Sequence, residues 1–232
     1  MCPRSGPTST RASSTRGWDK LREETIARQK ALGVVPADCR LTPRHAEISA
    51  WDEMPEALKP ILRRQMEVYA GFLEYTDHHI GRLLDGLNRL NIFDDTLVYY
   101  IIGDNGASAE GTINGAYNEM ANFNGLAALE TPEFLMARYD KLGGPQSYNH
   151  YAVGWAHAMN TPYQWTKQVA SHWGGTRNGT IVHWPSGIKA KGESARSSTM
   201  SSTWHPRSSR RWGCPSRSRS TACSSDRSKG SA

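Results

Sequence analysis

Cysteine is scarce in this chain of 232 residues: there are four, and Cys2, Cys214 and Cys223 lie close to the two ends. Because only Cys39 remains in the interior of the sequence, neither a disulfide framework nor a cysteine-based zinc site is expected. Long apolar runs are also missing, which argues against a membrane-spanning helix and gives no reason to expect a membrane partner. The first residues are rich in Ser, Thr and Arg and lack the apolar stretch of a signal peptide.

Acidic residues are nearly missing from the two ends. Residues 1–16 carry three arginines and no acid, and residues 194–232 carry eight basic residues and one acid, which leaves 17 basic and 21 acidic residues between them. The net charge of +6 therefore belongs to the ends, and it does not indicate nucleic-acid binding by the chain as a whole. Both ends lack apolar periodicity, so both are expected to be disordered.

Apolar side chains recur every three to four residues in two stretches, which predicts helices. The first stretch is residues 18–32, followed by Gly33 as a plausible stop. The second and longest is residues 54–90, with a break expected at Pro60. A shorter helix is expected to begin at Thr131-Pro132, where proline suits the first turn.

Residues 96–102 form a β-branched and aromatic run that predicts a buried strand, and a second short strand is expected at residues 180–184. Fully apolar strands are typical of parallel sheets, whose ligands bind beyond the carboxyl ends of the strands. Asp104 and Asn105 follow the first strand and offer oxygen atoms to a hard cation such as Ca²⁺. An Asp-Asn-Gly sequence is also typical of a simple turn, and the pattern alone leaves both interpretations open.

Few other interior side chains stand out as ligands. Glu119 lies in a loop rich in Gly, Asn and Ala, and it is interpreted as an exposed carboxylate. His150, His157 and His172 lie in residues 148–173, a segment rich in Tyr and Trp. That composition suits either the wall of a ligand pocket or an ordinary packed surface, so these histidines receive no role.

Several motifs occur in the order found in the sulfatase family, and the chain resembles the second half of the sulfatase catalytic domain. These motifs are a helical segment containing Asp77 and Gly81-Arg82, the strand ending at Asp104-Asn105-Gly106, the Gly174-Gly175-x-Arg177 sequence, and a strand ending in Trp184-Pro185-x-Gly187. Residues 124–167 are similar to bacterial-type arylsulfatases. The resemblance covers about residues 17–193, which we interpret as a partial sulfatase catalytic domain.

The resemblance implies an α/β fold, a fragment of an alkaline-phosphatase-like sheet that is mixed but mostly parallel and has flanking helices. It also implies Ca²⁺-dependent hydrolysis of aryl sulfate esters, which are small-molecule substrates, by the full-length enzymes of the family. Asp104 and Asn105 would be two of the Ca²⁺ ligands, and Lys167 would bind the sulfate group. Since the resemblance is to bacterial enzymes and no signal peptide is present, the bacterial cytoplasm is the expected location. The oligomeric state is left open.

The nucleophile of the family is absent from the sequence. Sulfatases use a formylglycine made from the Cys of a Cys-x-Pro-Ser-Arg motif, and neither Cys2-Pro3-Arg4 nor Cys214-Pro215-Ser216-Arg217 has this spacing. We therefore expect the chain alone to be inactive. Because the family pattern stops sharply near residues 17 and 193, we hypothesise that both end segments are translated out of frame, and sequencing the coding DNA tests this.

Two other interpretations stay open. A phosphoesterase or phosphonate hydrolase of the same superfamily would share the Asp104-Asn105 pair but differ around Gly174-Gly175. A non-enzymatic binding protein for RNA or acidic partners would depend on the Ser/Arg-rich residues 194–232 alone, which lack regular Arg-Ser repeats and carry few stacking aromatics. Salt-dependent RNA binding by this tail would distinguish the last interpretation from the other two.

Overall fold

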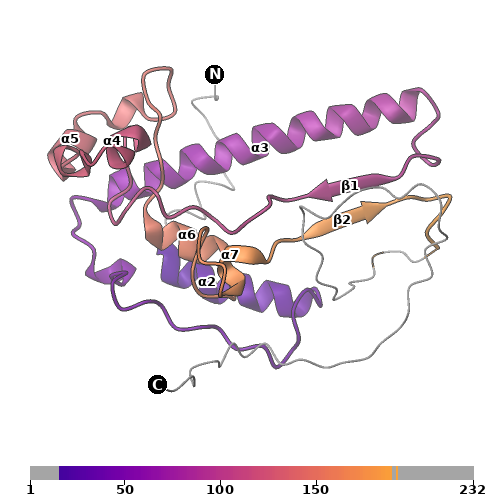
Figure 1. The fold of residues 1–232 in the computed structure, drawn as a ribbon, viewed down its shortest axis with the longest axis horizontal. Coiled ribbons are helices and arrows are strands. Elements are labelled where there is room, and N and C mark those ends of the chain that lie inside the picture. The colour runs from indigo at the N-terminus through magenta and orange to yellow at the C-terminus, as the bar shows by residue number, and fades with distance from the viewer. Residues whose placement is uncertain (1–15, 190–191, 193–232) are drawn as a thin grey trace.

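The computed structural model of the chain describes residues 16–189 and 192 (Figure 1). Within that part, the elements follow one another as α2 (Gly17–Ala31), η1 (Trp51–Glu53), α3 (Lys59–Arg89), β1 (Val98–Ile101), α4 (Glu119–Phe123), η2 (Ala127–Leu129), α5 (Pro132–Met136), η3 (Tyr139–Lys141), α6 (Val153–Met159), α7 (Trp173–Thr176) and β2 (Thr180–His183). None of the described helices combines the length and apolarity that crossing a bilayer requires.

Three tryptophans from separate elements form the centre of the core. The rings of Trp18 on α2 and Trp51 on η1 lie 4.8 Å apart, edge to face, and Trp155 on α6 lies 5.6 Å from Trp18. Trp155 is completely buried, and its indole nitrogen donates a 3.0 Å hydrogen bond to the carbonyl of Leu62. Gly154 is needed beside it because a Cβ there would overlap the Trp18 ring. The core therefore holds α2, α3 and α6 together.

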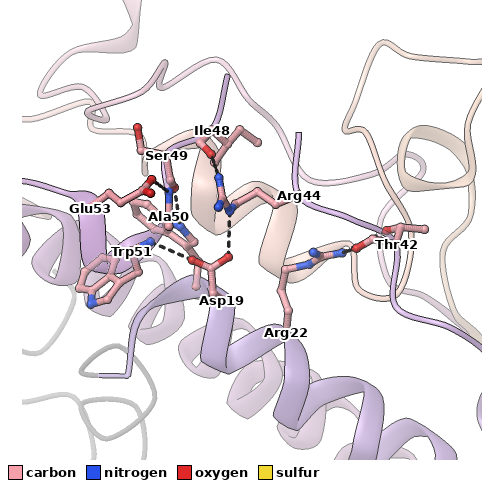
Figure 2. Close-up of polar contacts among 10 residues, drawn as sticks. Asp19, Arg22, Thr42, Arg44, Ile48, Ser49, Ala50, Trp51 and Glu53 are labelled. Carbon is pink, nitrogen blue, oxygen red and sulfur yellow. Dashed lines mark hydrogen bonds and ion pairs between the residues drawn. The ribbon is translucent and has the colours of Figure 1, made fainter. Parts of the chain in front are cut away.

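A polar network ties α2 to the loop that leads into η1 (Figure 2). Asp19 accepts a 2.8 Å hydrogen bond from the backbone nitrogen of Trp51 and pairs with the Arg44 guanidinium at 3.1 Å. One turn further, the buried Arg22 donates to the backbone and hydroxyl oxygens of Thr42. Burial lowers the pKa of Arg22 to about 10, so the side chain stays charged at neutral pH.

The longest helix, α3, has two different halves. Pro60 lies at its first turn, where its missing N–H costs nothing, so the break predicted at this proline is instead the beginning of the helix. Ile61, Leu62 and Gln65 are buried in the core, and Gln65 donates to the carbonyl of Asn114 at 3.0 Å. From residue 71 onward no side chain of α3 is buried.

The sheet in the described part of the chain is a single antiparallel pair, with Val98 opposite His183 and Ile101 opposite Thr180. The mostly parallel sheet expected from the sequence therefore stays a prediction. The strand was predicted to be buried, and this is wrong for the described chain: β1 is half-buried or exposed and β2 is fully exposed. An apolar run shows that a strand would be stabilised by burial, but it does not show that another layer is present to bury it. Among the described residues, no layer covers the β1–β2 pair.

The other predicted elements are confirmed to within a few residues. α2 corresponds to the helix expected at residues 18–32, and α5 begins at Pro132 with Thr131 as its cap, whose hydroxyl accepts from Phe134 at 3.3 Å. Beyond β2, Ser186 donates to the Asp95 carboxylate at 2.7 Å and so fixes the Trp-Pro-Ser-Gly turn against the entry to β1. The end segments predicted to be disordered lie outside the described residues, apart from Arg16.

Candidate functional site

Asp104 and Asn105 lie in the loop that follows β1, beside the Gly-Gly segment at the start of α7. Gly106 donates from its backbone nitrogen to the carbonyl of Gly175 at 2.9 Å, and the Asn178 amide donates to the carbonyl of Asn105. A Cβ at Gly106 would overlap the carbonyl oxygen of Gly174. The loop after the strand and the Gly-Gly segment are therefore in direct backbone contact.

Lys167 contacts the same loop, at Ala107. Its backbone nitrogen donates to the carbonyl of Ala107 at 3.0 Å, while the Asn160 side chain accepts from the backbone nitrogen of Ala107 at 2.9 Å. Gly174 and Gly175 have no room for side chains because their Cβ atoms would overlap carbonyl oxygens of residues 164–169. The loop after β1, the segment around Lys167 and the Gly-Gly segment are far apart in the sequence, and each contains a predicted site residue or motif. In the structure they are in contact.

The Lys167 ammonium is paired with a carboxylate that sequence reasoning did not single out. Its nitrogen lies 2.9 Å from one oxygen of Glu110 and 3.1 Å from the other. The Ser108 hydroxyl also donates to Glu110, and this bond, followed by those from Lys167, lowers the pKa of the Glu110 carboxyl below its usual value. Lys167 is therefore held in a fixed position by an anion.

Two further titratable residues adjoin Glu110. Glu119 and the buried His150 offer ligand atoms that lie with those of Glu110 all within 4.8 Å of one another. Two isolated bridges, between Ala116 and His150 and between Asn118 and Tyr148, bring the segments together. Glu119 is half-buried in this group, so its interpretation as an exposed loop carboxylate is wrong. The group suits a metal only in part, since both oxygens of Glu110 already bind Lys167.

Comparisons with known proteins identify the family of the chain. A family model described as Sulfatase matches residues 3–205. The chain belongs to the sulfatase family. An uncharacterized sulfatase of Schizosaccharomyces pombe is 31% identical over 180 residues, which are 77% of this chain and 31% of that protein. An arylsulfatase of Klebsiella aerogenes is 29% identical over 181 residues, 76% of this chain and 35% of that protein.

The chain spans about a third of the length of these curated sulfatases. The match to the family model extends beyond residues 17–193 at both ends. The boundaries of the partial domain, and the out-of-frame origin of the end segments, stay predictions.

A divalent cation, which the sulfatase family implies, finds oxygen ligands here but too few of them. Asp104 is exposed and Asn105 half-buried, and the Asn105 amide nitrogen donates to an Asp104 oxygen at 2.8 Å. This bond orients the pair and leaves the Asn105 side-chain oxygen available. Ca²⁺ takes six to eight oxygens, so these two side chains fit the cation's chemistry while filling only part of its shell.

The sequence did not predict roles for Glu110 and His150 because no local pattern distinguishes them. Glu110 contacts Lys167, which lies 57 positions later in the chain, and His150 lies in a segment that contains several other tyrosines and histidines. Of the other histidines left without a role, His157 is buried in α6, and His172 stands at the N-cap position of α7 without a capping hydrogen bond from its side chain. The glycine positions were the one signal that could have located the site, because close backbone contact requires glycine at positions 106, 174 and 175.

Glu110→Gln is expected to lower the free energy of unfolding by about 1 kcal/mol at pH 7, because the Lys167 pair is partly exposed. The pKa of Glu110 is lower in the folded state, so its contribution is present above pH 4.5 and disappears as the pH falls through the folded value. Urea unfolding at pH 7 and pH 3 measures this. Glu74→Gln, at an exposed position of α3, is the matched control, and an equal loss in both variants would contradict the prediction.

Proposed function

We propose that the chain supplies the cation-binding and sulfate-binding side of a sulfuric ester hydrolase of the arylsulfatase type. One observation carries the proposal: Gly106 and Ala107, which follow the Asp104-Asn105 pair, bind the backbones of Gly175 and Lys167 at 2.9 and 3.0 Å. Each of these motifs by itself is weak evidence for a site. Their direct backbone contact, in a chain of the sulfatase family, supports a shared role for the three segments.

The proposed roles follow from the chemistry of each side chain. Asp104 and Asn105 would hold Ca²⁺ through their side-chain oxygens, and the cation when bound would offset negative charge on the sulfate oxygens. Lys167 would present its ammonium to the same group after leaving Glu110, which keeps it oriented until then. Because the sequence contains no Cys-x-Pro-Ser-Arg motif, we propose that this chain by itself does not hydrolyse sulfate esters.

A chimera tests the function. The matching segment of the Klebsiella aerogenes arylsulfatase is replaced by residues 17–189 of this chain, and hydrolysis of 4-nitrophenyl sulfate and 4-nitrophenyl phosphate is measured. The proposal requires the sulfate ester to be preferred, and Asp104→Ala to lower its turnover by about 10²-fold or more. Asp38→Ala, at another exposed aspartate, is the control. A preference for the phosphate ester would favour the phosphoesterase alternative instead.

The cation part is tested on the full chain by calorimetric titration with Ca²⁺. With only two ligand side chains, we expect a dissociation constant of about 10⁻³ M or weaker. Asp104→Ala should abolish the remaining heat. Micromolar affinity, or binding that Asp104→Ala leaves unchanged while Glu119→Gln removes it, would contradict the assignment to Asp104 and Asn105.

A further inference from the structure

Three side chains with metal-ligand atoms converge beside Lys167. Carboxylate oxygens of Glu110 and Glu119 and a ring nitrogen of His150 all lie within 4.8 Å of one another. The backbone nitrogen of Glu119 donates to the carbonyl of Tyr148 at 2.9 Å, and the Asn122 side chain donates to the carbonyl of Glu110 at 2.7 Å. These bonds hold the segments together without using the three side chains, which we call the Glu-Glu-His group.

His150 has a ring nitrogen available inside the protein. The residue is only 9% exposed, and its Nδ1 atom lies 2.9 Å from the carbonyl oxygen of Tyr151. Because a carbonyl oxygen can only accept, Nδ1 donates its proton there, and Nε2 of the neutral ring keeps a lone pair. No described residue forms a hydrogen bond with Nε2. Metal-binding histidines typically donate their second nitrogen to a carbonyl in this way, which fixes the ring for the metal.

The two carboxylates of the group share a single described cation. Lys167 pairs with Glu110, whereas the carboxylate of the half-buried Glu119 has no hydrogen-bond or ion-pair partner among the described residues. Two carboxylates this close repel each other, and the repulsion is stronger where water is partly excluded. A divalent cation would neutralise both carboxylates, whereas the ammonium of Lys167 neutralises one.

We propose that Glu110, Glu119 and His150 form a binding site for a divalent transition metal such as Zn²⁺, and that the metal competes with Lys167 for Glu110. Three protein ligands with an open fourth position are a common zinc arrangement. The imidazole favours Zn²⁺ over Ca²⁺, which takes oxygen ligands. Ligand atoms about 2.1 Å from one zinc ion lie at most about 4 Å apart, so small side-chain rotations would close the group around the ion.

Zn²⁺ and Lys167 would compete because both need the Glu110 carboxylate. Its two oxygens bind the Lys167 ammonium at 2.9 and 3.1 Å, so the metal must take at least one of them, and two cations on one carboxylate repel each other. The Lys167 side chain is 36% exposed and can turn toward solvent, while that of Glu110 is 18% exposed. For the enzyme, this inference rests on the proposed function: the metal would release Lys167 from Glu110 and leave its ammonium available to the sulfate group.

Calorimetric titration with Zn²⁺ tests the site without any measurement of activity. The full chain carries Cys2→Ser, Cys214→Ser and Cys223→Ser, so that thiols near its ends do not bind the ion. One Zn²⁺ per chain is expected. Glu119→Gln and His150→Gln should each weaken binding at least about tenfold, because even the loss of a contact behind a metal ligand costs about 10–100-fold in affinity.

Lys167→Met distinguishes competition from simple binding. The substitution removes the ammonium that holds Glu110, so it should tighten Zn²⁺ binding by about tenfold or more. A variant that folds poorly would lose affinity, so a gain cannot arise from misfolding. Glu47→Gln, at an exposed position outside the Glu-Glu-His group, is the control and should leave the affinity unchanged.

Three results would overturn the inference: no Zn²⁺ binding, binding that Glu119→Gln and His150→Gln both leave unchanged, or binding that Lys167→Met fails to tighten. Zn²⁺ binding with the expected response to all three substitutions, together with an inactive chimera, would count against the proposed function alone. An active, sulfate-preferring chimera and a full chain that does not bind Zn²⁺ would count against this inference alone.

Discussion

Gly106→Ala is expected to lower the free energy of unfolding by about 3 kcal/mol and to detach the loop that carries Asp104 and Asn105. The new methyl group would overlap the carbonyl oxygen of Gly174, a backbone atom that cannot rotate away as a side chain could. Gly174 is itself packed closely against the carbonyls of Gln164 and Trp165, where an added Cβ would overlap both oxygens. Inserting a carbon into such close packing costs about 1–3 kcal/mol, and backbone overlap lies at the upper end.

Urea unfolding of the full chain measures this effect, with Gly81→Ala as the control. A Cβ at Gly81 on α3 meets no atom within 4 Å, and alanine is the better helix former. Gly81→Ala should therefore stabilise the chain by about 0.5–1 kcal/mol. If both variants change the free energy of unfolding in the same direction, the prediction based on close contact between the loop after β1 and the Gly-Gly segment is wrong.

His157 should make the chain sensitive to acid between pH 6.5 and pH 3. Its side chain is 2% exposed in α6, and its Nε2 atom has no hydrogen-bond partner among the described residues. Burial, assisted by the charges of Arg22 and Arg44, lowers the pKa of His157 to about 3. In the unfolded state the imidazole has its ordinary pKa of 6.5. Between pH 6.5 and pH 3 the unfolded state therefore binds a proton that the folded state does not bind.

The sign of the effect follows directly. Stability due to the neutral imidazole is complete above pH 6.5 and falls as the pH drops, until the folded-state pKa is reached. At pH 4.5 the loss is about 3 kcal/mol, on the order of 1.4 kcal/mol for each pH unit below 6.5. His157→Gln should remove this part of the pH dependence, whatever its stability at pH 7. Urea unfolding at several pH values compares it with the control His78→Gln, at an exposed position of α3, and an equal change of slope in both variants would contradict the prediction.

Helices and strands were largely predictable because their signals are local. The apolar periodicity of residues 18–32 and the Thr131-Pro132 start both correspond to observed helices. Pro60 was misinterpreted because the same missing N–H that breaks a helix in its interior is harmless at its first turn. The predicted burial of β1 is also wrong. An apolar run indicates that burial would stabilise a strand, but it does not indicate which layer, if any, covers it.

By itself, the sequence determined the family and the order of the motifs, because each motif is a short run of residues whose spacing can be compared directly. Only the tertiary structure decided that Lys167 is paired with Glu110, that His150 and Glu119 adjoin this pair, and that no side chain of α3 from residue 71 onward is buried. The contact between Glu110 and Lys167 joins positions 57 residues apart, and such a contact is decided by how the chain packs and leaves no mark in the local sequence pattern.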